Sequence, residues 1–456
     1  MEQKKTNHID MLSGSLLDKI CLFALPLCAS SVLQQLFNAA DVAVVGHFAS
    51  NRALAAVGAN SSAINLLVNL FVGLSVGANV VIGHFIGQNK PQKVQEAIHT
   101  IISIALISGF FLLLLGQCIA RPLLTLMNTP EDVRDMAVLY LRIYFLGMPF
   151  IMLYNFGSAI LRSKGDSKRP LYCLLISGVV NVLLNLLLVI VCQLSVAGVA
   201  IATVISNVIS AIMILQFLIS EASPFTLNIR SLSLKKEYIM RVVKIGAPAG
   251  LQGMVFSFSN VCIQTALNGF GANAIAGSAA ALNFECFGFF VINAFTQACV
   301  TFTSQNYGAH NFERCRTIFR LSFLCGIAGN IILCGFFLLF RVPLISIYSP
   351  DTSVMMYGLT RMLCTLPFDW IMCGYEVSAG ALRGMGRSML PAIITIFGTC
   401  IFRLCWVFTI FPHFQTFRML MTVYPASWII TACIMMTTYG IVRRNIYAVV
   451  EPIKTA

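Results

Sequence analysis

LPLCASSVLQQLFNAADVAVVGHFASN, residues 25–51, returns in altered form as APAGLQGMVFSFSNVCIQTALNGFGAN, residues 247–273. The two stretches align without a gap at an offset of 222 residues. The identities are Pro26 with Pro248, Asn38 with Asn260, Phe48 with Phe270 and Asn51 with Asn273. A segment of this length that recurs in register indicates a duplicated unit.

Two further blocks repeat in the same order. The Gln-Asn pair at 88–89 matches 305–306, and LRSKGDSKRP at 161–170 matches LRGMGRSMLP at 382–391. Three matched blocks in one order are hard to obtain by chance. The sequence therefore predicts a fold built from two similar halves.

The composition places both halves in a membrane. Of 456 residues, 58% are hydrophobic and 10% are charged, and the mean hydropathy is +0.84. Charge-free runs longer than the roughly 18 residues of a spanning helix lie at 20–40, 53–89, 97–120, 143–161, 170–220, 245–284, 286–312, 321–340 and 419–442. Dividing the run 170–220 at CQLSVAG and counting a kinked pair between 354 and 411 gives twelve helices. We predict an all-α integral membrane protein, since the runs lack the alternation of barrel strands.

The net charge of +13 follows topology. If the N-terminus is inside, the inner segments hold 22 of the 30 Lys and Arg residues, which places both termini in the cytoplasm of a cell-membrane protein. Basic segments then anchor lipid headgroups, and nucleic acid is not an expected partner. The opening MEQKKTNHIDMLSGS lacks the apolar run of a cleavable signal peptide. Sixteen cysteines without a CxxC motif argue against a metal site or a disulfide framework.

An even number of helices in each half predicts parallel repeats, related by an axis along the membrane normal. We expect an N-terminal lobe at 1–219, a cytoplasmic linker with a short interfacial helix at 220–241, and a C-terminal lobe at 242–456. Two such lobes can rock to give alternating access. The sequence leaves the oligomeric state open, with a monomer as the working expectation.

Polar side chains of the first half lie at one depth. Gln34, Asn38 and Asp41 share a face of the first helix, and Asn181 and Asn185 are one turn apart in the fifth. From the helix rise, Asp41 lies roughly 9 Å below the outer end of its helix, and Asn185 and Thr203 lie roughly 12 Å below it. An acid in an apolar run is costly and marks a function by default. Its oxygens suit a hard cation, or a proton.

Together, the two six-helix halves, the paired inner loops, the Gln-Asn pairs and the acid in FNAADVAVVG resemble the multidrug and toxic compound extrusion (MATE) transporters, in particular their bacterial DinF/MepA-like branch. The resemblance implies cation-coupled antiport of amphipathic, often cationic, organic compounds. It matches Asp41 to the family's essential first-helix acid. It also matches Asn155, Asn181 and Thr203 to positions around that acid, and Gln34 and Asn38 are expected to face the substrate.

One departure concerns the coupling ion. Many relatives carry a second acid in the fifth helix, where this chain reads NVLLNLLL with Asn185 in that place. A sodium ion at Asp41, Asn181 and Thr203 would therefore meet one carboxylate instead of two, which weakens its binding. The departure favours a proton as the coupling ion, because a carboxyl group in apolar surroundings takes up a proton more readily than in water. We expect a proton from outside to bind Asp41 and release the substrate, with no cofactor besides the coupling ion.

The second half has its own acids. Glu285, with Asn283 and Phe287 beside it and Trp370 in another helix, is expected to hold cationic substrates through charge and cation-π attraction. Asp369 and Arg403 lie at one depth, which predicts a buried ion pair, with substrate contact as the alternative. Glu376 either lines the inner vestibule or pairs with Arg387, and its role stays open.

Rival functions have less support. The chain has no Walker motif and no HExxH, so an enzyme is not expected. GLSVG at 73–77 fits the GxSxG pattern of a nucleophilic serine, but it lies in an apolar run, where small residues serve helix packing. A flippase for a lipid-linked saccharide is the main alternative, and it would favour a cationic cavity. A channel or receptor is a third class, which two rocking lobes argue against.

Overall fold

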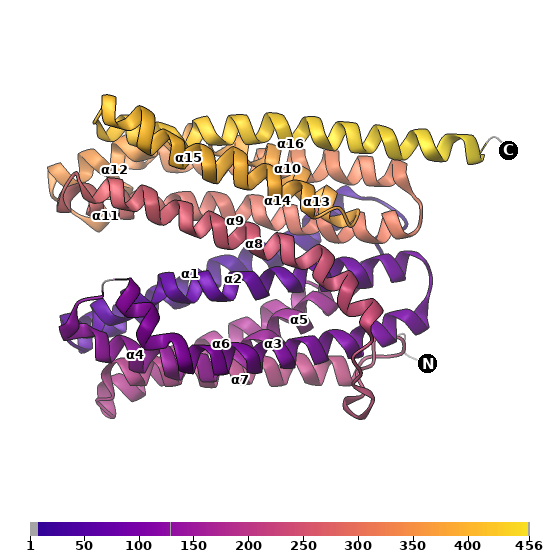
Figure 1. Ribbon diagram of the computed structural model, residues 1–456, viewed down its shortest axis with the longest axis horizontal. Coiled ribbons are helices and arrows are strands. Elements are labelled where there is room, and N and C mark those ends of the chain that lie inside the picture. Colours follow the sequence, from indigo (N-terminus) through magenta and orange to yellow (C-terminus); the bar gives the residue numbers. More distant parts are fainter. Residues whose placement is uncertain (1–7, 128, 455–456) are drawn as a thin grey trace. The chain divides into compact units, whose positions relative to one another are not determined.

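The computed structural model describes residues 8–127 and 129–454, with side chains throughout except at 51, 54, 59, 61–63, 65, 66 and 447–454. The opening MEQKKTN, on which the predicted orientation partly rests, lies outside this range. All regular structure in the described part is helical, as predicted, and Figure 1 shows the helices of each half running side by side. The first half comprises α1 (Leu17–Phe48), α2 (Asn51–Gly87), α3 (Pro91–Leu126), α4 (Glu131–Leu146), α5 (Met148–Lys164), α6 (Lys168–Asn185) with the π-helical turn η1 (Leu186–Val191), and α7 (Ser195–Ile219).

The second half follows the same plan. Its helices are α8 (Lys236–Asn268), α9 (Ala272–Gly308), α10 (Phe312–Leu339), α11 (Arg341–Tyr348), α12 (Thr352–Thr365), α13 (Met372–Gly384), α14 (Met389–Thr395), α15 (Phe402–Cys405) and α16 (Phe417–Lys454). Short turns of other helix types interrupt the chain between α12 and α13 and on both sides of α15: η3 (Leu366–Ile371), η4 (Ile396–Ile401), η5 (Trp406–Ile410) and η6 (Phe411–His413). Pro367 in η3 removes a backbone donor, which accounts for the break that was predicted as a kink.

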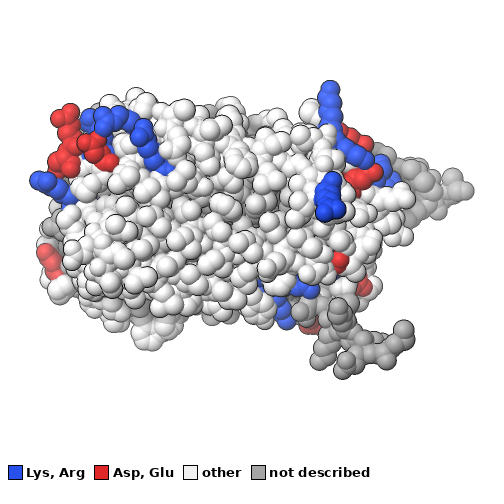
Figure 2. Space-filling view, turned by 90° about the horizontal axis from the view of Figure 1, so that it is seen from below, with Lys and Arg blue, Asp and Glu red and all other residues white. Residues whose placement is uncertain are grey.

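Twelve membrane passes can be followed through the described residues. Nine helical segments are long and apolar enough to span a bilayer, and α4 with α5, bent by 48°, forms a tenth. The other two are α8 and the run from α12 through η3 to α13, which have the length of a span but are more polar. On the face in Figure 2, charged side chains gather toward both ends of the helices, and the band between is uncharged. Both observations agree with the predicted twelve-helix membrane protein.

The compact units divide two helices instead of the linker. Of the described residues, one unit comprises Leu25–Gly250 with 8–10, and the other comprises Met11–Ala24 with 251–454. We call them the first lobe and the second lobe. The sequence predicts that the first lobe ends at 219 and that the second begins at 242. Helix α7 does end at Ile219, but α8 begins at Lys236, before the predicted start of the second lobe. The first half of α8 thus belongs to the first lobe.

Glycines explain how α8 packs onto α2. A Cβ at Gly73 would lie 2.2 Å from the amide nitrogen of Gly250, and a Cβ at Gly77 would lie 2.4 Å from the carbonyl oxygen of Val242. Only residues without a side chain permit such an approach between helix backbones. The GLSVG stretch therefore serves packing, as its apolar setting indicated.

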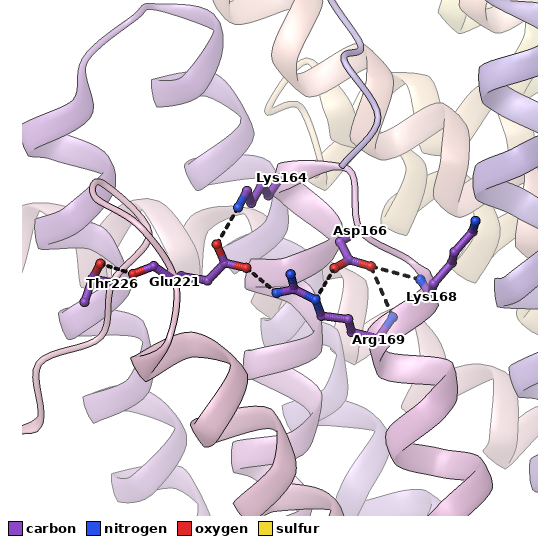
Figure 3. Close-up of polar contacts among 6 residues, drawn as sticks. All are labelled: Lys164, Asp166, Lys168, Arg169, Glu221 and Thr226. Atoms are coloured by element: carbon purple, nitrogen blue, oxygen red, sulfur yellow. Dashed lines mark hydrogen bonds and ion pairs between the residues drawn. The ribbon is translucent and has the colours of Figure 1, made fainter. Parts of the chain in front are cut away.

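The linker, residues 220–235, is held to the rest of the first lobe by partly buried ion pairs (Figure 3). Glu221 accepts hydrogen bonds from Lys164, at 2.6 Å, and from Arg169. Arg169 also pairs with Asp166 at 3.1 Å. Burial opposes ionisation of Glu221, but the hydrogen bonds from Lys164 and Arg169 outweigh it and lower the pKa of this carboxyl. The basic loop between α5 and α6 is therefore an anchor for the linker.

Candidate functional site

The first lobe brings α1 and α6 into close contact at Gly178. A Cβ on this residue would lie 1.8 Å from a ring carbon of Phe37, so the ring of Phe37 fills the space that a side chain would occupy. Asn181 and Asn185 follow Gly178 by three and seven residues and lie on the same face of α6. In α1, Asp41 follows Phe37 by one helical turn. The glycine thus lets the acid of α1 reach the amides of α6.

A short hydrogen-bond chain forms at this contact. The side-chain amide of Asn185 donates to a carboxylate oxygen of Asp41 and also to Oδ1 of Asn181, at 3.2 Å. Asn185 is fully buried, Asn181 is nearly so and Asp41 is half-buried. Among the described residues, no Lys or Arg forms an ion pair with Asp41. The hydrogen-bond partner of the Asp41 carboxyl is therefore a neutral amide.

The amide of Asn185 bridges the other two polar groups. Its nitrogen lies between an oxygen of Asp41 and Oδ1 of Asn181 and donates to both. The third expected sodium ligand, Thr203, donates its hydroxyl to the carbonyl of Val199, at 2.9 Å, within its own helix. The three expected ligands thus take part in hydrogen bonds in this structure, and sodium binding at them stays a prediction.

The other residues expected around Asp41 are less closely involved. Asn155 donates to the carbonyl of Ile151 in its own helix, at 2.8 Å. Gln34 and Asn38 are exposed on α1, on the turns that precede Asp41. The structure thus joins three of the five expected cation-site residues by hydrogen bonds.

Two tyrosines near Asp41 escaped the sequence analysis. Tyr140 and Tyr144 of α4 stack with ring centroids 6.2 Å apart and lie within electrostatic range of the carboxyl. Their spacing of one helical turn in LYLRIYFL is the signal that could have revealed them.

In the second lobe, Glu285 is already paired. Both of its oxygens accept hydrogen bonds from Arg361, at 2.7 and 2.8 Å, and Thr365 donates to it at 2.8 Å. Arg361 also donates to the hydroxyl of Ser278, at 2.6 Å. The expectation that Glu285 offers an unpaired charge to an organic cation is therefore corrected, because Arg361 neutralises it. Arg361 stands in the apolar sequence YGLTRMLCTL, a setting as unusual as that of Asp41.

The predicted pair of Asp369 and Arg403 is wrong. Asp369 accepts a hydrogen bond from Asn330, at 2.7 Å, whereas Arg403 donates to Ser427, at 3.0 Å, and to Asn260, at 3.2 Å. Helix rise fixes the depth of a residue but not the direction in which its side chain points. The charged neighbour of Glu376 is Arg383.

The remaining expected substrate residues do not gather at Glu285. Asn283 is half-buried and donates to the carbonyl of Ala279 in its own helix, at 3.1 Å. Phe287 packs against the rings of Phe290 and Phe337. Trp370 is 40% exposed, and its ring nitrogen donates to the carbonyl of Pro367, at 3.1 Å.

Comparison with known proteins places the chain among transporters. The MatE family model matches residues 26–187 and residues 248–409, which are displaced by the same offset as the repeat. The probable multidrug resistance protein YoeA of Bacillus subtilis is 26% identical over 385 residues, which cover 82% of this chain and 83% of the relative. The probable multidrug resistance protein NorM of Thermotoga maritima is 25% identical over 396 residues, which cover 86% and 85%.

Solved structures share the fold. The outward-facing structure of a multidrug resistance MATE family transporter of the MOP superfamily matches with a TM-score of 0.90 at 21% sequence identity. The match covers 97% of this chain and 99% of the other. At this identity the likeness establishes the architecture, and the chemistry must be argued from the residues themselves.

Proposed function

The chain belongs to the MatE family of multidrug efflux transporters, and from this premise we propose that it exports amphipathic, often cationic, organic compounds across the cell membrane in exchange for protons. The observation that carries the choice of ion is the amide of Asn185 between the oxygens of Asp41 and Asn181. A neutral donor in this position supports a carboxyl that changes its protonation state over one that binds a metal ion.

Asn185 can serve both states of the acid. It donates to the Asp41 carboxylate, and its own Oδ1 is buried with no hydrogen-bond partner among the described residues. When Asp41 is protonated, rotation of the amide offers that oxygen to the new O–H donor. Proton uptake then reverses the direction of the hydrogen bond between Asn185 and Asp41 and removes the charge of Asp41.

The transport cycle follows from this exchange. A proton from outside neutralises Asp41 and releases the substrate. The transporter with protonated Asp41 then changes to its inward-facing state, in which the proton leaves to the cytoplasm. A ligand shifts such an equilibrium only through a difference in its affinity for the two states, and the charge of Asp41 supplies that difference for a cation. We place both termini in the cytoplasm and take the monomer as the working unit.

A flippase for a lipid-linked saccharide is less well supported. Its pyrophosphate headgroup would call for several free positive charges. Glu285 neutralises Arg361, and Arg403, which has no ion pair among the described residues, is the one counterexample. The named relatives are multidrug resistance proteins.

Reconstituted liposomes test the proposal. Purified protein should export ethidium when a pH gradient alone is imposed, and a sodium gradient alone should give no export above protein-free liposomes. Export driven by sodium and indifferent to the pH gradient would refute proton coupling. Failure of both gradients, with flipping of a lipid-linked saccharide, would support the alternative.

A further inference from the structure

Arg403 in the second lobe is a buried charge with no direct ion-pair partner among the described residues. Its side chain is 1% exposed, and its hydrogen bonds go to the hydroxyl of Ser427 and the amide oxygen of Asn260. The guanidinium carbon lies 4.7 Å from the ring centroid of Tyr424 and 5.3 Å from that of Phe256. All four partners are neutral, and no Asp or Glu of the described residues forms an ion pair with Arg403.

The contrast with Arg361 shows how unusual this is. Arg361 is equally buried, but Glu285 balances its charge through two hydrogen bonds. A charge that is hydrogen-bonded only to neutral groups within a membrane protein carries a large desolvation cost. Hydrogen bonds and aromatic faces recover part of this cost. A residue kept at such a cost within a transporter is a candidate for binding a charged ligand.

The position of Arg403 strengthens this reading. In the repeat, α8 corresponds to α1, and Asn260 corresponds to Asn38 of the first lobe. The matched inner loops at 161–170 and 382–391 place Arg403 opposite Val182 in sequence, next to Asn181. The second lobe thus carries a positive charge in the helix pair where the first lobe carries Asp41.

Asn260 is the exposed hydrogen-bond partner of Arg403. Asn260 is exposed on α8, and Phe256 lies one helical turn before it. Because Asn260 holds Nη1 at 3.2 Å through a neutral oxygen, a carboxylate that replaces this oxygen gains a charge-assisted hydrogen bond. The rings of Phe256 and Tyr424 flank the guanidinium and can contact the apolar body of the ligand.

We propose that Arg403 and Asn260 form a subsite for the carboxylate of amphipathic substrates. This inference rests on the proposed export function and assigns a binding site to it. Asn260 covers the guanidinium in the absence of substrate and swings aside when the carboxylate arrives.

Rhodamine B and its ethyl ester test the subsite, because they differ only in the carboxylate. Binding to the purified full-length protein is measured at equilibrium without any gradient. Arg403→Gln should weaken the binding of rhodamine B about tenfold, the worth of one charge-assisted hydrogen bond, and leave the ester within about twofold. Arg403→Lys, which keeps the charge, should retain rhodamine B binding within about threefold.

One further variant separates this site from the proton site. The selective loss of rhodamine B binding caused by Arg403→Gln should persist in an Asp41→Asn background, so a failure of proton coupling would not affect this test. Equal loss of both dyes in Arg403→Gln, no loss of either, or no binding of rhodamine B by the wild type would overturn the proposal.

Discussion

The acids Asp41 and Glu285 illustrate how two halves of one duplicated sequence came to differ. Asp41 of the first lobe contacts the neutral amide of Asn185, whereas Glu285 of the second lobe is held at both oxygens by Arg361. The repeat places Ile263, and no acid, opposite Asp41. The duplication therefore kept the helical frame, while the charged groups arose separately in each lobe.

The partners of the two acids decide whether each can lose its charge: Asp41 can be neutralised by a proton, whereas Glu285 is held ionised by Arg361. Protonating Asp41 breaks no ion pair, whereas protonating Glu285 would leave Arg361 buried without its counter-charge. We assign the coupling proton to the first lobe and a structural role to the ion pair of the second.

The largest effect on export is expected when the charge of Asp41 is removed. Asp41→Asn keeps the size and hydrogen bonds of the side chain but cannot exchange a proton, so pH-driven export of ethidium should fall to the level of protein-free liposomes. Yield and thermal stability should match the wild type. Export by this variant at more than about a tenth of the wild-type rate would place the coupling proton elsewhere.

The fixed pair is tested through stability. Arg361→Gln leaves the carboxylate of Glu285 buried and unpaired, which should lower the free energy of unfolding by about 3 to 5 kcal/mol. The double variant Glu285→Gln with Arg361→Gln removes both charges and should regain most of that loss. Thermal unfolding in detergent measures both. A double variant as unstable as the single one would show that the pair does more than neutralise charge.

The contact that brings Asp41 to α6 should be sensitive to size. Gly178→Ala places a methyl group where the ring of Phe37 lies, so export should fall roughly tenfold as the hydrogen bond to Asn185 is strained. Phe37→Leu in the same chain makes room and should restore part of the activity. No loss in Gly178→Ala would mean that α1 reaches its position without this close approach.

The smallest effect concerns the linker anchor. Because the pKa of Glu221 is lowered, its ion pairs stabilise the anchor at neutral pH, and this contribution is lost as the pH falls through that lowered pKa. Hydrogen exchange across residues 220–226 should therefore become faster, relative to its intrinsic rate, below about pH 4. Glu221→Gln should show the faster exchange already at pH 7. Equal protection from exchange in the wild type and Glu221→Gln at pH 7 would show that the ion pairs of Glu221 do not hold the linker in place.

Sequence reasoning found the parts of the site that local patterns reveal. The charge-free run before Asp41 and the one-turn spacing of Asn181 and Asn185 are legible without a structure. The partner of Glu285 was missed because Arg361 lies 76 residues away, on a helix whose facing direction depends on packing. The pairing expected for Arg403 failed for the same reason, since depth along a helix leaves the facing direction undetermined.

The boundaries between the lobes show the same limit. Helix ends follow polar and basic residues, so the end of α7 at Ile219 coincides with the end predicted for the first lobe. The inclusion of the start of α8 in the first lobe depends on contacts such as that between Gly73 and Gly250, which no local pattern reveals.

Proton release on substrate binding tests the central claim most directly. Ethidium is added to purified protein in weak buffer near the pH at which half of the wild-type sites are protonated, and the protons released are counted with an indicator dye. The wild type and the double variant Glu285→Gln with Arg361→Gln should both release protons in proportion to the ethidium bound, whereas Asp41→Asn should bind without release. Release by Asp41→Asn, or its loss in the double variant alone, would contradict the assignment of the coupling proton to Asp41.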